Sequence, residues 1–424
     1  MKPEDVLKFS LADFTYNDSD GVLNPPEDFN AWIQDPRVAT AMSFFEQPLH
    51  NSPKPRTELS GGHLGKRRPV INLTSYNYLG LSTHPEVVQA AAQALMHYGV
   101  GASGAAMLSG TFDQHVLLAQ ELAAFKGQDA CMLFSSGYGG NLGAIQGLLQ
   151  KGDVLVVDSK CHRSVVDGAT LSGAKMVSFA HNDAASLDET LARHAGKRRM
   201  VVVEGVYSMD GDVANLPALL DVCDAHDVPL YLDEAHSSLV YGETGRGLGE
   251  HFGVEDRIGV HFGTLSKAFG GVGGFVCGEA SIMRYLKCYA ASFQFSCALP
   301  PAIVAAMRKS LEVATRDNTL REKLWANVRH FRSNLIAMGL DIGESTSQVI
   351  PIIVGSSGEQ LIELAMAAQE RGLYLQPIDF PAVEAHSRRF RISVSAQLSA
   401  ADIDEASNII EDVIARPLGL VGAA

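Results

Sequence analysis

The chain has 424 residues, enough for two or three domains around a large core, and its 46% apolar and 19% charged residues are ordinary for a globular enzyme. Its net charge of −14 argues against a nucleic-acid partner, which calls for a basic patch. No apolar stretch reaches membrane-spanning length, and the N-terminus has neither a signal-peptide core nor an Arg-rich transit pattern, so we expect a cytoplasmic protein without a membrane span.

The first 70 residues are expected to form a peripheral arm that is partly ordered at best. Between Met1 and Asp35 there are eight acidic residues against two lysines, together with several Asn and Pro residues. The six cysteines of the chain are scattered without a CxxC pair, so we expect reduced thiols, no disulfide framework and no metal site.

From about residue 71, strands alternate with helices. Near-continuous β-branched runs that are joined through helices predict a mostly parallel sheet covered on both faces. The expected strands lie at 130–134, 153–158, 198–204, 229–233, 258–262 and 275–277, and helices follow several of them, as at 163–173 and 216–227. We therefore predict an α/β fold with a large domain over 71–305.

Around residue 300 the pattern changes to long helices that lead into short strands. Helices over 300–317, 320–339, 359–372 and 401–415, with strands near 348–355, 373–379 and 389–396, predict a smaller C-terminal α+β domain over 306–424. The segment Gly99–Gly104 ("GVGASG") matches a dinucleotide-binding pattern, but a predicted helix precedes it where that site requires a strand.

Polar residues follow the predicted strands at the edge of the sheet where ligands bind in open α/β folds. After 130–134 comes a glycine loop that opens a helix, which suits a phosphate. The other strand ends carry His162, Ser208, Asp233 with His236, and finally Thr264, Ser266 and Lys267.

Each of these residues also has a purely structural interpretation. Lys267 could belong to a solvated turn, and His162 or Asp233 could cap a helix. Together, however, an amine, a carboxylate, two imidazoles and a phosphate loop match the needs of pyridoxal 5'-phosphate (PLP): an imine, a partner for the pyridine nitrogen, a stacking ring and a donor to the phenolic oxygen.

The motifs "SYNYLGLSTHP", "LFSSGYGGN", "EGVYSMDGD", "LDEAHSSLVYGETGRG", "GTLSKAFGGVGG", "FSCALPPA" and "RFRISVSA" resemble those of the α-oxoamine synthases, a family of fold-type I PLP enzymes. The resemblance covers about residues 44–413. It implies a C-acyltransferase that condenses glycine, alanine or serine with an acyl thioester, on CoA or an acyl-carrier protein, and releases carbon dioxide to give an α-aminoketone.

The resemblance also implies roles for individual residues. Lys267 becomes the Schiff-base lysine, Asp233 the partner of the pyridine nitrogen, His162 the stacking ring and His236 the donor to the phenolic oxygen, with Ser208 in the same pocket. Arg391 and Tyr76 become ligands of the amino-acid carboxylate. The phosphate is assigned to Ser136, Gly137, Tyr138, Thr264, Ser266 and, across a homodimer interface, Ser296.

Several departures leave the substrates open. Tyr76 stands where several members have asparagine, Ala106 where relatives carry arginine or histidine, and Gln397 where histidine is common. Two other functions are kept as alternatives: another fold-type I PLP reaction, such as that of an aminotransferase or a decarboxylase, and a non-catalytic partner subunit, which would lack the lysine.

Overall fold

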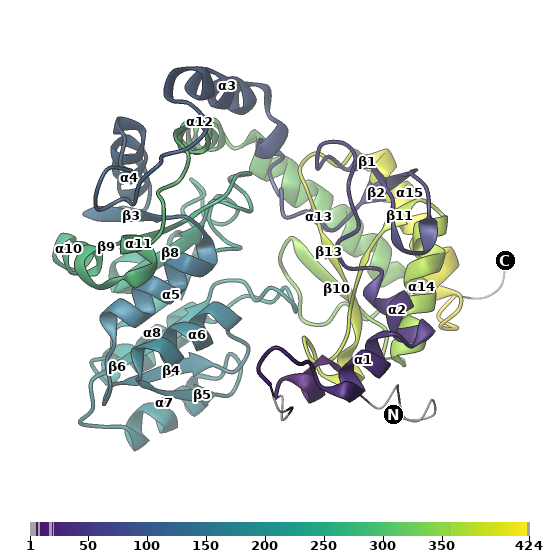
Figure 1. Cartoon of the computed structure of the whole chain (residues 1–424), viewed down its shortest axis with the longest axis horizontal. Coiled ribbons are helices and arrows are strands. Elements are labelled where there is room, and N and C mark those ends of the chain that lie inside the picture. The colour runs from purple at the N-terminus through teal and green to yellow at the C-terminus, as the bar shows by residue number, and fades with distance from the viewer. Residues whose placement is uncertain (1–5, 7–8, 17–18, 20, 356, 422–424) are drawn as a thin grey trace. The chain divides into compact units, whose positions relative to one another are not determined.

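The computed structural model describes residues 6, 9–16, 19, 21–355 and 357–421. The chain divides into two compact units (Figure 1). The large unit is Tyr76–Trp325, and the split unit combines Met1–Ser75 with Ala326–Ala424. The predicted domain boundaries at residues 70 and 305 stay a prediction.

A seven-stranded sheet forms the centre of the large unit. Its strand order is β3-β9-β8-β7-β6-β4-β5, and only β9 runs antiparallel to its neighbours. The predicted mostly parallel sheet is thus confirmed. The strands are β3 (Ala130–Phe134), β4 (Val154–Asp158), β5 (Lys175–Phe179), β6 (Arg199–Glu204), β7 (Leu230–Asp233), β8 (Val260–Thr264) and β9 (Gly274–Gly278).

Helices connect these strands and cover the sheet (Figure 1). Phe134, Ile145, Val202, Tyr231 and Phe262 belong to one buried cluster between the strands and helices such as α5. This burial explains why the strands read as apolar runs. The helices are α3 (Pro85–Tyr98), α4 (Asp113–Phe125), α5 (Gly137–Leu148), α6 (Arg163–Ser172), α7 (Ala184–Arg193), α8 (Leu216–Ala225), α9 (Leu248–Phe252), α10 (Ala280–Tyr289), α11 (Ala291–Gln294) and α12 (Pro301–Arg316), with short turns η4 (Leu81–Thr83) and η5 (Glu255–Arg257). Helix α3 precedes Gly99–Gly104, as predicted, whereas a dinucleotide site would have a strand there.

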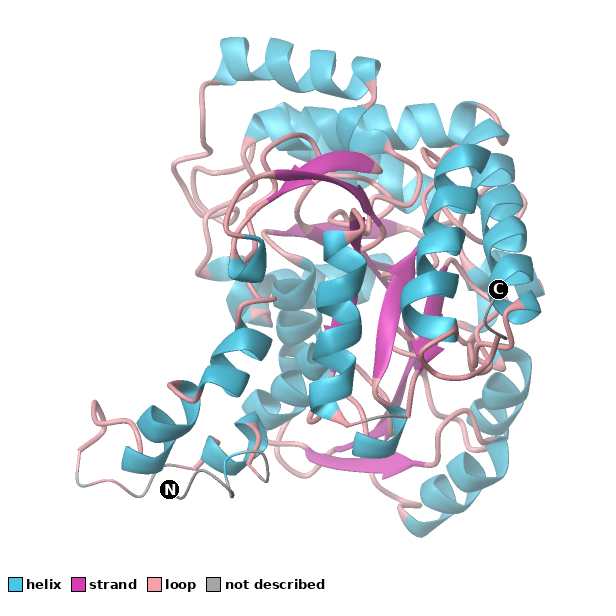
Figure 2. Cartoon of the chain, turned by 90° about the vertical axis from the view of Figure 1, so that its right-hand side faces the viewer, coloured by secondary structure: helices cyan, strands magenta, loops and turns pink. Residues whose placement is uncertain are grey.

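The split unit contains two three-stranded sheets, with the orders β1-β2-β11 and β10-β13-β12. Figure 2 shows strands in magenta among helices in cyan. The strands are β1 (Arg56–Leu59), β2 (Arg68–Asn72), β10 (Val349–Ile353), β11 (Leu373–Tyr374), β12 (Gln376–Ile378) and β13 (Arg389–Ser393). The helices are α1 (Glu27–Ile33), α2 (Pro36–Met42), α14 (Gly358–Glu370) and α15 (Ala400–Ile410). The short elements are η2 (Leu11–Phe14), η3 (Gly62–Leu64), η6 (Ala385–Ser387) and η7 (Glu411–Ala415). The boundary with the large unit lies within α13 (Thr319–Ala337).

The acidic N-terminal segment has a small apolar cluster of its own. Val6, Trp32 and Val38 are buried in it, and Phe14 and Phe29 pack against them. Four of its acidic residues, Glu4, Asp5, Asp18 and Asp20, lie outside the described residues. Within the described part of the chain, no helix is both long and apolar enough to cross a bilayer.

Candidate active site

Lys267 lies in the tight link between the antiparallel strands β8 and β9. Main-chain hydrogen bonds shape the link: Leu265 N–H donates to Gly273 O at 2.9 Å, and Gly270 N–H donates to Lys267 O at 2.9 Å. Gly270 has φ +81°, and a Cβ there would lie 2.3 Å from the main-chain nitrogen of Ser82. The glycines therefore allow a close turn that presents one half-buried lysine at the carboxyl edge of the sheet.

A hydrogen-bonded chain connects this lysine to two buried rings. Lys267 Nζ lies 2.7 Å from His236 Nε2, and His236 Nδ1 lies 2.7 Å from the hydroxyl of Tyr78. Either ring nitrogen of His236 can carry the proton, so the two contacts hold the imidazole in place between Lys267 and Tyr78. His236 and Tyr78 are 5% and 0% exposed, so the two rings are shielded from water.

A second network joins Asp233 to His162. Asn141 Nδ2, on α5, donates to Asp233 Oδ2 at 2.7 Å and to Ser164 Oγ at 3.0 Å. Ser164 Oγ in turn lies 2.7 Å from His162 Nδ1. Tyr231 donates its hydroxyl to Asn141 Oδ1 at 2.8 Å, which fixes the orientation of the amide.

His162 and Asp233 also have the capping contacts of the structural interpretation. His162 Nδ1 accepts from Ser164 N–H at the start of α6, and Asp233 Oδ1 accepts from Ala235 N–H at 2.9 Å. These contacts hold both side chains at the strand ends, so a capping role and a role in binding are compatible.

Two carboxyl groups lie in register on neighbouring strands, Glu204 on β6 and Asp233 on β7. Burial raises the pKa of the Asp233 carboxyl, while the charge of Lys267 and the amide of Asn141 act in the opposite direction. Burial raises the pKa of Glu204 far more, and the charge of Asp233 adds to that effect. Burial thus disfavours the charged form of Glu204 more strongly than that of Asp233, so Asp233 is the better partner for a cation.

The predicted phosphate residues gather at the N-terminus of α5. Ser136 caps this 12-residue helix by accepting from Gly139 N–H at 2.9 Å, and Gly137 and Tyr138 follow it. Thr264 Oγ1 is 2.8 Å from Ser266 Oγ, and a Cβ on Gly137 would lie 2.7 Å from Thr264 Oγ1. Because Gly137 has no side chain, the N–H groups at the start of α5 and the hydroxyls of Thr264 and Ser266 lie close enough together to hold one anion.

The other predicted residues lie at different places. The Tyr76 ring is 5.9 Å from Lys267 Nζ, within cation–π range. Ser208 is in the turn after β6, and Ser296 lines a cavity of ≈ 290 Å³ together with Ala106. Arg391 is on β13 of the split unit, opposite Pro351 and Gln376.

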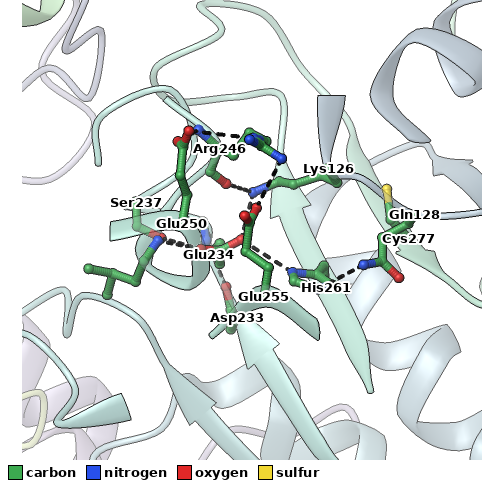
Figure 3. A network of polar contacts seen from close by, with 12 residues as sticks. Lys126, Gln128, Asp233, Glu234, Ser237, Arg246, Glu250, Glu255, His261 and Cys277 are labelled. Atoms are coloured by element: carbon green, nitrogen blue, oxygen red, sulfur yellow. Dashed lines mark hydrogen bonds and ion pairs between the residues drawn. The ribbon is translucent and has the colours of Figure 1, made fainter. Parts of the chain in front are cut away.

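A buried ion pair lies beside Asp233 (Figure 3). Glu234 Oε2 is 2.6 Å from Lys126 Nζ, and each side chain is 1% exposed. Leu248 N–H donates to Glu234 Oε1 at 2.7 Å, and His261 Nδ1 is 3.7 Å from Oε2. Burial raises the pKa of Glu234, but the charges of Lys126 and His261 outweigh this effect and hold the pKa at about 2. This pair ties the end of β7 to the end of α4.

Sequence reasoning missed several members of these networks: Tyr78, Asn141, Ser164 and the pair Lys126–Glu234. Tyr78, Asn141 and Glu234 stand inside the quoted motifs, so the motifs contained a signal that residue-type reasoning did not use. Lys126 carries no local signal, since its partner Glu234 lies 108 residues away, and Ser164 connects the nearby His162 to Asn141, 23 residues away.

These groups suit PLP. Its phosphate needs an anion cradle, its ring nitrogen a carboxylate and its aldehyde an amine, and the large unit brings all three to one edge of the sheet. Asp233 is a buried carboxyl acceptor and Gly137 leaves the space that a Cβ would fill, as such a ligand requires. Fold and site together define the class of fold-type I PLP-dependent enzymes.

Comparisons with known proteins agree. The family model of class I and II aminotransferases matches residues 68–410. The 8-amino-7-oxononanoate synthase of Thermoanaerobacter pseudethanolicus is 38% identical over 367 residues, which cover 86% of this chain and 91% of that protein. The 4-hydroxy-2,2'-bipyrrole-5-methanol synthase of a Serratia species is 33% identical over 403 residues, 95% of this chain and 61% of that protein.

Among solved structures, the serine palmitoyltransferase of Sphingomonas wittichii superposes with a TM-score of 0.88 at 32% identity, covering 93% of this chain and 99% of that one. The chain belongs to the α-oxoamine synthases, within the class I and II aminotransferase family. The predicted family and fold class are confirmed, and PLP is the cofactor of that family. The relatives are named for different products, so they leave the product of this chain open.

Proposed function

We propose that the chain catalyses the PLP-dependent, decarboxylative condensation of a small amino acid with an acyl thioester to give an α-aminoketone. The observation that carries this proposal is the contact of 2.7 Å between Lys267 Nζ and His236 Nε2, beside a buried Asp233 on which the charge of Lys267 acts. This arrangement offers an amine, a proton acceptor and a carboxylate at one end of the sheet.

When bound, PLP supplies the electron sink for the carbanion that forms at the amino-acid Cα. Asp233 would keep the ring nitrogen protonated, and Asn141 holds that carboxylate in place. Lys267 would hold the aldehyde and then move the Cα proton, while His236 would hold the phenolic oxygen. The ring of His162, at the start of α6, would lie against the cofactor ring. Gly137 and its neighbours at α5, with Thr264, would bind the phosphate.

The amino-acid carboxylate is assigned to Arg391 of the split unit and to Tyr76 of the large unit. Arginine offers two parallel N–H groups to a carboxylate, so the choice rests on geometry as well as charge. Arg389, two residues earlier, is 4% exposed, and its Nε donates to the Ser387 carbonyl at 2.8 Å. Arg391 is only partly buried on the same strand, which supports it as the ligand.

A homodimer with Ser296 at the neighbour's phosphate is part of the proposal. Ala105 forms a β-bridge with Cys297, so the Gly99–Gly104 turn and the Ser296 segment lie together. Apolar side chains on these segments are strongly exposed in the single chain, with Val100 at 84% and Phe295 at 85%. Such side chains support an interface there. The cytoplasmic location stays a prediction.

The test is a coupled assay with purified holoprotein. Glycine, alanine or serine is supplied with acyl-CoA substrates of several chain lengths or with an acyl-carrier protein, and both the thiol and carbon dioxide are measured. Equal amounts of thiol, carbon dioxide and aminoketone are expected. An aminotransferase would form a keto acid without thiol release, and a decarboxylase would release carbon dioxide without a thioester, so either result would overturn the proposal.

Borohydride reduction tests the site. It should attach the cofactor to Lys267, and Lys267→Ala should lose both the label and the activity. Lys175→Ala is the control, because Lys175 is an exposed lysine on the edge strand β5 of the same unit. A label on any other lysine would contradict the assignment of Lys267.

A further inference from the structure

A histidine bridges two aspartates at the carboxyl edge of the large sheet, outside the groups assigned above. His181 follows β5, and its Nδ1 lies 2.9 Å from Asp158 Oδ1 at the end of β4. Its Nε2 lies 2.8 Å from Asp212 Oδ2, in the segment after β6. The His181 side chain is 20% exposed, whereas Asp158 is 0% and Asp212 11% exposed. Three separate segments therefore meet at one imidazole.

The bridge requires a charged ring. Carboxylate oxygens only accept hydrogen bonds, so a ring that contacts one at each nitrogen must donate from both, and only the imidazolium does so. Burial lowers the pKa of His181, but the hydrogen bonds to Asp158 and Asp212 outweigh it and raise the pKa to about 9. His181 is thus a cation throughout the neutral range.

The segment that the bridge holds is the turn Tyr207–Val213, which carries Ser208. Gly211 N–H donates to Tyr207 O at 2.8 Å and Tyr207 N–H to Asp212 O at 3.1 Å, which closes the turn on itself. The Tyr207 ring meets the His181 ring edge-on, with centroids 4.5 Å apart. His181 therefore contacts this turn through both a charge and a ring.

The next residue adds a second tie to the same turn. Asn182 N–H donates to Asp158 Oδ2 at 2.8 Å, and Asn182 Nδ2 donates to Val213 O at 2.9 Å. Asn182 Oδ1 accepts from Asn215 N–H at 2.7 Å. Asp158 is thereby bound on both oxygens, and the turn is anchored at Asp212, Val213 and Asn215.

We propose that the Asp158–His181–Asp212 bridge is a positioning element that holds the turn Tyr207–Val213, and with it Ser208, at the cofactor end of the sheet. The inference rests on the proposed function for the role of Ser208. The holding of the turn itself is independent of that role and can be measured without the cofactor.

The bridge responds to pH through His181. The groups that face it are Asp158 from β4, with Asp212 and the phenol of Tyr207 from the turn. Asp210 of the same turn pairs with Lys160, which follows β4, at 3.1 Å, and burial raises the pKa of Glu204 at the end of β6. Because the pKa of His181 is raised above its ordinary 6.5, the contribution of the bridge is fully present below pH 6.5 and is lost as the pH rises through about 9.

The experiment compares His181→Gln with wild type by hydrogen-exchange mass spectrometry, using peptides that cover residues 205–214 and protection factors corrected for intrinsic rates. The glutamine amide can donate to one of the two aspartates only, because its other polar atom is a carbonyl oxygen, which cannot donate to the second carboxylate. Protection in the turn should fall by about 10- to 100-fold, the worth of one charge-assisted hydrogen bond. In wild type the same loss should appear between pH 8 and 10, and His181→Gln should show no such transition.

The matched control is His226→Gln. His226 Nε2 lies 2.7 Å from Asp188 Oδ1, and its side chain is also 20% exposed. His226 is the C-cap of α8 and precedes β7, so it lies at the end of the sheet opposite to the site. Its protection factors over 205–214 should equal those of wild type. The dissociation constant for PLP, measured separately, should rise in His181→Gln and not in the control.

The outcomes separate the two proposals. Unchanged protection over 205–214 in His181→Gln, together with no transition in wild type up to pH 10, overturns the positioning role. If His181→Gln does not fold, the pH transition of wild-type protein decides alone. Lost protection with an unchanged PLP dissociation constant leaves the bridge holding the turn but removes Ser208 from cofactor binding.

Discussion

Removing Lys126 should destabilise the fold strongly, because its partner Glu234 would remain buried without a compensating charge. The two groups are 2.6 Å apart, and each is 1% exposed. Breaking a buried ion pair by removing one partner typically costs about 3–5 kcal/mol. We expect Lys126→Met to lose stability in that range, which for a unit of this size lowers Tm by about 6–20 °C.

The pKa of Glu234 supports this magnitude. A value of about 2 in place of the ordinary 4.5 corresponds to ~3 kcal/mol of stabilisation of the carboxylate by its surroundings. Because the pKa is lowered by folding, this stabilisation is present above pH 4.5 and is lost as the pH falls toward 2. Lys126→Met should therefore also flatten the decline of stability between pH 4.5 and the acid limit.

Thermal and urea unfolding at pH 7 would measure the loss. Lys309→Met is the matched control, since Lys309 pairs with Glu312 at 2.5 Å but the side chains are 30% and 57% exposed; it should cost less than ~1 kcal/mol. Adding Glu234→Gln to Lys126→Met removes the orphaned charge and keeps an acceptor for Leu248 N–H, so it should recover part of the loss. If Lys126→Met costs no more than the control, the reasoning about this pair is wrong.

Three further predictions concern the proposed function. Asp233→Asn should retain PLP but lower turnover by about 10²–10⁴-fold, the range that such groups supply; near-normal turnover would mean that another group protonates the ring. Arg391→Ala should weaken amino-acid binding by about one to two powers of ten, with Arg391→Lys between it and wild type, in titrations followed by the visible absorbance of the cofactor. Arg389→Ala should instead lower stability, and the reverse pattern would exchange the two roles. Gly137→Ala would place a methyl group 2.7 Å from Thr264 Oγ1, so PLP affinity by equilibrium dialysis should fall by about 5- to 100-fold, and unchanged affinity would remove the phosphate from this position.

The sheet and the location of the site could be read from the sequence because both follow from local patterns. Apolar runs marked β4, β6, β7 and β8, and the rule that ligands bind beyond parallel strand ends brought Lys267, Asp233 and His162 to one edge. Strand β5 (Lys175–Phe179) was not predicted, since it is an edge strand with an exposed, mixed sequence. The helices of the acidic N-terminal segment were not predicted either, because Trp32 and Phe14 pack against each other although the sequence between them is mostly polar.

The networks behind the site were harder to predict because they depend on contacts between distant segments. Asn141 and Asp233 are 92 residues apart, and Tyr78 and His236 are 158 apart. Residue type restricts such partners weakly, since an asparagine or tyrosine has many possible roles. Only the packing of α5 and the Tyr78 segment against the sheet selects these two.

The adjacent residues Asp233 and Glu234 show how the fold separates stability from chemistry. Side chains alternate across an extended chain, so the two carboxyl groups point to different surroundings. Glu234 meets Lys126, and its charge is satisfied within the protein. Asp233 accepts hydrogen bonds from the amide of Asn141 and from a main-chain N–H, yet burial still raises its pKa, so a further cation at the site would stabilise its charge. The ion pair of Glu234 anchors the strand end and so can keep the adjacent Asp233 buried, although burial of its charge is unfavourable. A buried carboxylate of this kind is stabilised by a nearby cation and therefore favours the protonated form of a ring nitrogen. Because the two carboxyl groups are adjacent at one strand end, we expect Lys126→Met to disturb the position of Asp233 as well as to lower the stability of the fold.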